Sequence, residues 1–145
     1  MPECAIDTTV LQKANAPLTN VPRERSLFRR RLNLLKQIQA GTNTILISRK
    51  LLAEYRRQVS VPRNDFIRAF FALLADPVRP IWNWQYRWSG GTREKARGCR
   101  YPEEDDHVLR TAIRPTPSTI FTEEYRMLIA DECIYLCFRV HISLP

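Results

Sequence analysis

Four acidic residues lie at or near junctions between predicted elements of this chain. Asp7 follows the apolar run ECAI, and Glu54 lies in the helix-like segment RKLLAEYRRQV. Asp105 belongs to EEDDHVLRTA, and Glu124 comes just after STIFT. Carboxylates that are brought together repel one another unless protonation or a cation neutralises them. Hard oxygen ligands suit Mg²⁺ or Mn²⁺, and the lack of paired histidines or cysteines beside these acids disfavours zinc.

Each acid also has an ordinary structural interpretation. Asp7 suits the cap at the end of a strand. Glu54 suits a surface pair with Lys50 or Arg57 on the same helix, a contact worth roughly 0.2 to 0.5 kcal/mol. Acids such as those of residues 103–106 favour a helix N-terminus by about 0.3 to 1 kcal/mol each. This dipole effect accounts for one or two acids there more readily than for four.

The elements that must position these acids alternate along the chain. Residues 44–48 (TILIS) form a predicted strand, and Ser48 is a predicted N-cap for the helix that follows. The first apolar run and residues 118–122 are the other clear strands. Such alternation predicts an α/β domain with a largely parallel sheet, spanning 1–145 as a single unit. Ligands bind such sheets at the carboxyl ends of the strands.

The remaining segments are predicted from periodicity and from turn residues. Apolar spacing predicts helices over 23–39, ended by Gly41, and over 64–75. Residues 81–88 (IWNWQYRW) alternate like a strand, and 89–102 carry the glycine, proline and charge typical of a loop. The last part of the chain is predicted as a helix through about Ile113, a helix over 123–131 and a strand over 134–142.

The charge balance favours a polyanionic partner. The chain has 145 residues, with 23 Lys plus Arg against 15 Asp plus Glu, a net charge of +8 and a pI near 9.8. Much of the excess lies in 23–36 and 93–100, which are candidate phosphate-contacting surfaces or, equally well, solvated faces. No apolar run approaches the roughly 20 residues that span a bilayer, and no signal peptide is visible. A cytoplasmic protein that does not enter membranes is therefore expected.

Three further groups of residues admit competing interpretations. The four cysteines are expected to be reduced thiols in a chain without a secretion signal. Cys133, Cys137 and His141 are spaced by four, as in a partial zinc site on a helix, but the β-branched and aromatic residues between them favour core thiols on a strand. The row Trp82, Trp84, Tyr86 and Trp88 suits base stacking, and suits a core or protein interface better. His107, two residues after Asp105, is expected to be structural.

In order and spacing, the four acid-bearing segments resemble those of the PIN-domain family of metal-dependent ribonucleases. That family includes the toxins of many bacterial and archaeal toxin–antitoxin pairs. The matching segments are AIDTTVL, ISRKLLAEYRR, DDHVLRTA and TIFTEEYRML, and together they cover nearly the whole chain. In the last segment, relatives usually have Thr, any residue and Asp, where this chain has Thr122, Glu123 and Glu124. Glu is one methylene longer than Asp, so this difference bears on the geometry of a metal site.

The resemblance implies a three-layer α/β/α fold with a central, mostly parallel sheet and a Mg²⁺- or Mn²⁺-dependent endoribonuclease activity. The implied metal ligands are Asp7, Glu54, Asp105 and Glu124, with Thr9 and Thr122 hydrogen-bonded to them. It also implies an antitoxin partner and a homodimer. The basic residues assigned to the RNA backbone are Arg29, Arg30, Arg31, Arg93, Lys95, Arg97 and Arg100.

Two other functions fit parts of the sequence. A fold of this kind that has lost catalysis would serve as an RNA-binding or protein-interaction module, as Glu124 and the aromatic segment 81–88 suggest. DNA cleavage by a flap-nuclease-like relative is less favoured, because the short chain has no predicted helical arch or DNA-binding appendage.

Overall fold

The computed structural model describes residues 2–83 and 88–145 and is built around one five-stranded sheet. The strand order is β3-β2-β1-β4-β5, and every neighbouring pair is parallel. The strands are β1 (Glu3–Ile6), β2 (Thr44–Ile47), β3 (Ile81–Trp82), β4 (Ser118–Phe121) and β5 (Val140–Ser143).

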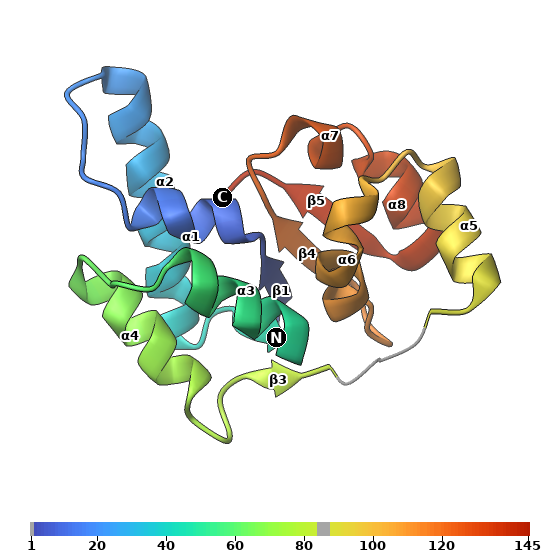
Figure 1. Cartoon of the computed structure of the whole chain (residues 1–145), viewed down its shortest axis with the longest axis horizontal. Helices are drawn as coiled ribbons and strands as arrows, with labels where there is room; N and C mark the ends of the chain where they lie inside the picture. The colour runs from blue at the N-terminus through green and yellow to red at the C-terminus, as the bar shows by residue number, and fades with distance from the viewer. Residues whose placement is uncertain (1, 84–87) are drawn as a thin grey trace.

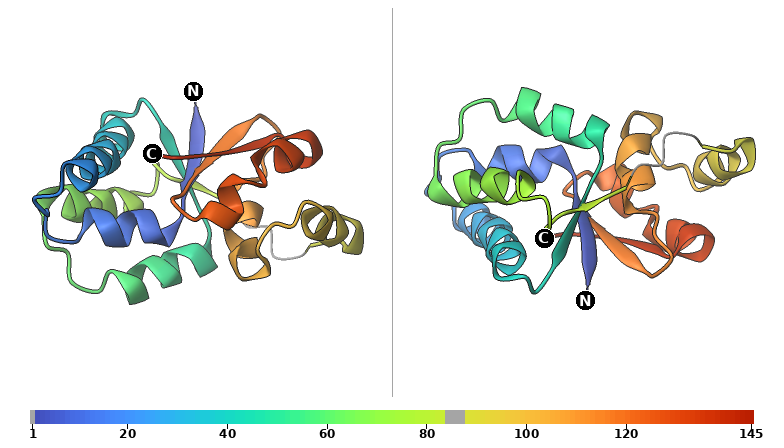
Figure 2. Two further views of the ribbon diagram at one scale, coloured as in Figure 1. Left: turned by 90° about the horizontal axis from the view of Figure 1, so that it is seen from above. Right: turned by 90° about the horizontal axis from the view of Figure 1, so that it is seen from below.

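Helices connect each strand to the next and cover both faces of the sheet (Figure 1). The first group is α1 (Thr8–Ala14), α2 (Pro22–Ala40), α3 (Arg49–Gln58) and α4 (Asp65–Leu74). The second group is α5 (Gly90–Gly98), the 3₁₀ turn η1 (Glu103–Asp105), α6 (Asp106–Ala112), α7 (Tyr125–Leu128) and α8 (Asp131–Phe138). Figure 2 shows the sheet edge-on between the two groups, which confirms the predicted α/β/α layering.

Local signals in the sequence set several of these boundaries. Gly41 ends α2 in the left-handed conformation, at φ 81°, which glycine adopts without steric cost. The side chains of Ser48 and Asn64 accept hydrogen bonds from the backbone of Leu51 and Ile67, as N-caps of α3 and α4. Within the described ranges, no helix is both long and apolar enough to cross a membrane.

The buried core lies between the sheet and its two helical layers. The strands supply β-branched and aliphatic residues that face both layers, as expected for a parallel sheet covered on both sides. The largest fully buried side chains are Tyr55, Ile6, Leu11, Ile38, Ile45, Leu46, Ile47, Leu51, Ile67, Leu109, Ile120 and Met127.

Two predicted elements are wrong in type. The glycine-rich segment expected to be a loop forms α5, because Ser89 caps its first turn and the glycines fall only in the first turn and at the last residue. The strand expected over 134–142 is instead helix α8 followed by β5. Asp131 and Glu132 in the first turn favour the helix, and Arg139 ends it with φ 56°. The acidic first turn and the left-handed residue at the C-terminus of α8 outweigh the β propensity of the segment.

The aromatic segment is described only at its two ends. Ile81 and Trp82 form β3 and pair with β2, and Trp88 packs against the core. Trp84 and Tyr86 lie outside the described residues, so the proposed aromatic row stays a prediction.

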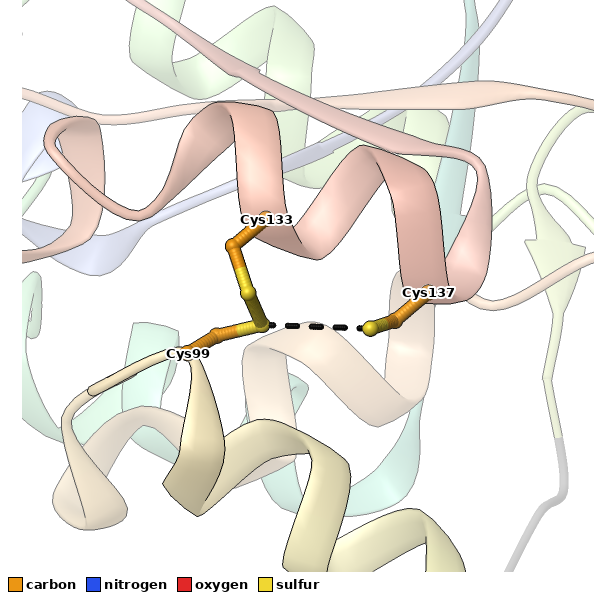
Figure 3. Close-up of side chains that lie close together, drawn as sticks. All are labelled: Cys99, Cys133 and Cys137. Carbon is orange, nitrogen blue, oxygen red and sulfur yellow. Dashed lines mark hydrogen bonds between the residues drawn. A yellow bond between two sulfur atoms is a disulfide. The ribbon is translucent and has the colours of Figure 1, made fainter.

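The expectation that all cysteines are reduced is wrong for two of them. Cys99 at the end of α5 and Cys133 on α8 form a disulfide, with Cα atoms 5.5 Å apart (Figure 3). Cys137 follows one turn later on α8, and its Sγ lies 3.9 Å from that of Cys99. Sequence alone missed the pair because α5 was taken for a loop and α8 for a strand.

Reduction of this disulfide should lower the stability of the protein. The bond joins residues 34 positions apart. In the chain-entropy description, closing a loop of that length contributes about 3 to 4 kcal/mol to the free energy of unfolding. Urea unfolding with and without a phosphine reductant should show a loss of that order. The Cys137→Ser variant should lose as much stability on reduction as the wild type. An equal loss on reduction of Cys99→Ser, which cannot form this disulfide, would contradict the assignment.

Candidate metal centre

The four predicted acids lie at the edge of the sheet formed by the carboxyl ends of the strands. The chain places β2 and β3 on one side of β1 and then returns to place β4 and β5 on the other. The strand order therefore reverses between β1 and β4, which is where open α/β sheets bind ligands. Asp7 directly follows β1, and Thr122 and Glu124 directly follow β4.

Asp7 is held by hydroxyl groups from two segments. Its backbone N–H donates to Phe121 O at 2.9 Å, and its side chain is almost fully buried. Thr9 and Thr122 donate to Asp7 Oδ2 at 2.9 and 2.8 Å. Burial raises the pKa of Asp7, the two threonine hydroxyls lower it, and the charge of Glu54 raises it. Both threonines thus occupy the positions that the sequence predicted for them.

Glu54 lies on α3, which contacts α6 beside the carboxyl ends of the strands. Thr8, the first residue of α1, donates its hydroxyl to Glu54 Oε1. Nε2 of the buried His107 lies 2.7 Å from Glu54 Oε2, an ion pair when the imidazole is protonated. Glu54 therefore faces the site, and the alternative surface pair with Lys50 or Arg57 is not what the structure shows.

Asp105 is the electrostatic centre of the cluster. It ends η1 and precedes α6, with its backbone oxygen accepting a 2.8 Å hydrogen bond from the Tyr101 hydroxyl. Partial burial, followed by the charges of other carboxylates, raises its pKa from 3.8 to about 7. Those carboxylates are Asp7, Glu104, Glu124 and Glu54, in decreasing order of effect. Asp7, Glu54 and Glu124 therefore all lie within electrostatic range of Asp105.

Glu124 stands at the rim of the site. Its backbone N–H donates to Thr122 Oγ1 at 3.0 Å, so one hydroxyl connects Asp7 to the residue that starts α7. The Glu124 carboxylate accepts from Arg126 Nε at 3.2 Å, and Arg126 also pairs with Glu104. Arg126 thus offsets part of the negative charge on the solvent side, a role that the sequence reasoning did not assign.

The structure does not bring the four carboxylates into one tight cluster. Among the described residues, the group of three potential ligands whose atoms all lie within 4.8 Å of one another is Cys99, Cys133 and Cys137, and it contains no acid. A single cation held by Asp7, Glu54, Asp105 and Glu124 together would therefore require their oxygens to move closer.

Glu123 and Arg31 form a buried ion pair beside the site. Arg31 Nε and Nη2 donate to the two Glu123 oxygens at 2.6 and 2.7 Å, and both side chains are nearly inaccessible. The Glu123 carboxylate raises the pKa of Arg31. The assignment of Arg31 to RNA binding is therefore wrong, because its guanidinium connects α2 to the segment after β4.

Four of the other basic residues lie on two separate helices. Arg29 and Arg30 are exposed on α2, and Arg93 and Lys95 are exposed on α5. Figure 1 places these helices at opposite ends of the molecule, so the two basic segments do not form one patch. Arg97 is half-buried and pairs with Asp106 and Glu103, and Arg100 is exposed at the end of α5.

Three contacts at the site were not predicted. Thr8 binds Glu54, His107 faces Glu54, and Arg126 bridges two acids. The sequence does offer a signal for Thr8, because Thr8 and Thr9 are adjacent helical residues whose side chains point in different directions. Thr9 binds Asp7, and Thr8 binds Glu54. His107 lies on the site side of α6, which no local pattern specifies.

Comparison of the chain with protein-family models, with curated proteins and with solved structures finds no match.

Replacing Arg31 with Ala should destabilise the protein strongly. The change leaves the Glu123 carboxylate buried without its main partner, and breaking a buried pair typically costs about 3 to 5 kcal/mol. The neighbouring substitution Arg30→Ala removes an exposed side chain and should stay within about 0.5 kcal/mol of the wild type. Chemical denaturation of both variants measures the difference, and equal stabilities would contradict the buried pair.

Replacing Asp105 with Asn should stabilise the metal-free protein at neutral and higher pH. The folded state holds the Asp105 proton up to about pH 7, whereas the unfolded chain releases it near 3.8. The free energy of unfolding therefore falls as the pH rises between these values, and the variant escapes this loss. Melting temperatures in a chelator should diverge from the wild type above pH 5 and meet below pH 4. The control Asp65→Asn, at an exposed site, should show no such divergence.

Proposed function

We propose that this protein is a Mg²⁺- or Mn²⁺-dependent endoribonuclease of the PIN-domain type, acting as the toxin of a toxin–antitoxin pair. The observation that carries the proposal is the arrangement around Asp105, whose pKa is raised by partial burial and then by nearby carboxylates that include Asp7, Glu124 and Glu54. Such an arrangement is unfavourable for folding by itself, and a divalent cation offsets it. The layered α/β/α fold agrees with the resemblance seen in the sequence.

Asp7, Glu54, Asp105 and Glu124 are the residues that would hold the cation. Bound there, Mg²⁺ or Mn²⁺ would lower the pKa of a water and neutralise charge on the phosphoryl oxygens. The threonine hydroxyls fix the direction of the Asp7 carboxylate and leave its other oxygen, Oδ1, for a ligand. Thr8 and His107 restrain Glu54 at both of its oxygens, Oε1 and Oε2, so a cation would have to share these oxygens with them.

The substrate would approach from the exposed edge of the sheet. RNA is the proposed substrate because the chain is basic overall and because of the family resemblance. Arg126 is an exposed cation that pairs directly with a proposed ligand, since its Nε lies 3.2 Å from Glu124. It is therefore better placed to contact a phosphate beside the cleaved bond than the exposed arginines of α2, Arg29 and Arg30.

The second candidate function is a module that binds RNA or protein without cleaving. It is favoured by Glu124, which is longer than the usual Asp and is held by Arg126 at the rim. Metal titration separates the two candidates. An enzyme should bind Mn²⁺ at millimolar concentrations, and a module should bind RNA without binding Mn²⁺.

Asp7→Asn and Asp105→Asn should each lower RNA cleavage by at least about a hundredfold with either metal, because each removes a ligand charge. The assay is cleavage of a labelled single-stranded RNA at pH 8 in Mg²⁺ or Mn²⁺, with a chelator as the blank. The matched control Asp65→Asn should cleave like the wild type. Unchanged cleavage in both site variants would exclude the proposed centre, and a wild type that binds RNA without cleaving it would favour the module.

A further inference from the structure

Three cysteines meet at the far side of the second helical layer, between α5 and α8. Cys99 is buried at the end of α5, while Cys133 and Cys137 lie one turn apart on α8 and reach solvent. Figure 3 shows all three side chains pointing toward one another. The three sulfur atoms lie within 4.8 Å of each other. Cys137 takes no part in the disulfide, so its position is not explained by that bond.

The spacing of the sulfur atoms matches a tetrahedral metal site. Zn–S bonds of about 2.3 Å at tetrahedral angles place sulfur atoms about 3.8 Å apart. Cys137 Sγ lies 3.9 Å from Cys99 Sγ, which is this separation. Cys133 precedes Cys137 by four residues, so both project from the same face of α8. Once the disulfide opens, rotation of the Cys133 side chain would bring the third sulfur to the same distance.

We propose that Cys99, Cys133 and Cys137 form a site for a thiophilic divalent cation such as Zn²⁺, and that the Cys99–Cys133 disulfide closes this site. Three thiolates with one open coordination position bind soft or borderline metals such as Zn²⁺ in preference to Mg²⁺ or Mn²⁺. The site is separate from the carboxylate centre in ligand chemistry, and it does not depend on the proposed nuclease activity.

A dithiol reductant converts the disulfide form of the site into the reduced form that binds metal. One reductant thiolate attacks a sulfur of the disulfide, and the second then closes the reductant's own disulfide. Two electrons pass to the protein, and Cys99 and Cys133 become thiols. Binding of one Zn²⁺ by the three thiols releases up to three protons and leaves a complex of charge −1. In the reverse direction a disulfide oxidant accepts two electrons and becomes a dithiol, the Cys99–Cys133 bond forms again, and the metal loses two of its three ligands and is released.

Cobalt provides the test, because Co²⁺ bound to thiolates gives a charge-transfer band in the near ultraviolet. The full chain is reduced with a water-soluble phosphine, freed of reductant without air and titrated with Co²⁺ and then with Zn²⁺. We expect one Co²⁺ per chain, displaced by one Zn²⁺, and no band in the oxidised protein. Cys137→Ser should weaken cobalt binding by more than about tenfold. A tenfold loss of affinity is the lower end of the effect of mutating a residue that only contacts a metal ligand, and Cys137 is a proposed ligand itself.

Two control variants complete the experiment. Cys4 lies in β1, away from the cluster, where burial raises its pKa to about 12, so Cys4→Ala should bind cobalt like the wild type. Asp105→Asn should also bind normally, which separates this site from the carboxylate centre. The proposal fails if the reduced wild type gives no thiolate band, if Cys137→Ser binds as tightly, or if the oxidised protein binds equally well.

Discussion

The mutual repulsion of carboxylates at one edge of the sheet is the constraint on which the other features of this site depend. Asp105 holds its proton far above the usual pH because it is partly buried and because four other acids lie nearby. The groups nearby act against this repulsion: two threonine hydroxyls fix Asp7, His107 and Thr8 hold Glu54, and Arg126 offsets the rim. A protein without a function for these acids would gain stability by losing them, since sites that destabilise the fold are usually retained for activity.

The sheet topology explains why residues so far apart in sequence meet there. The reversal of the strand order between β1 and β4 brings the segments that follow these two strands side by side at this edge. The buried Arg31–Glu123 pair then anchors the segment after β4 to α2, which fixes where Glu124 begins α7. Charge is thus used twice in this region, once as a buried pair that holds the backbone and once as an exposed cluster.

The sequence predicted the elements whose signals are local. The cap at Ser48, the stop at Gly41 and the junctions that follow strands at Asp7 and Thr122 follow from residue type and spacing. The prediction failed at α8, where the acidic first turn and the left-handed Arg139 outweigh the β propensity of the segment. It also failed where a distant partner decides. Arg31 shows the same limit, since an arginine in a basic run reads as solvated unless its partner, 92 residues away, is known.

The segment between Cys99 and Asp105 connects the two parts of the molecule where charge and thiol chemistry gather. Its first residue is fixed to α8 by the disulfide, and the Tyr101 hydroxyl binds the Asp105 backbone oxygen at its other end. Tyr101 is itself buried, so the core holds this segment between its two ends. The disulfide at Cys99 and the hydrogen bond at Asp105 therefore connect α8 and the acidic cluster through one short stretch of chain.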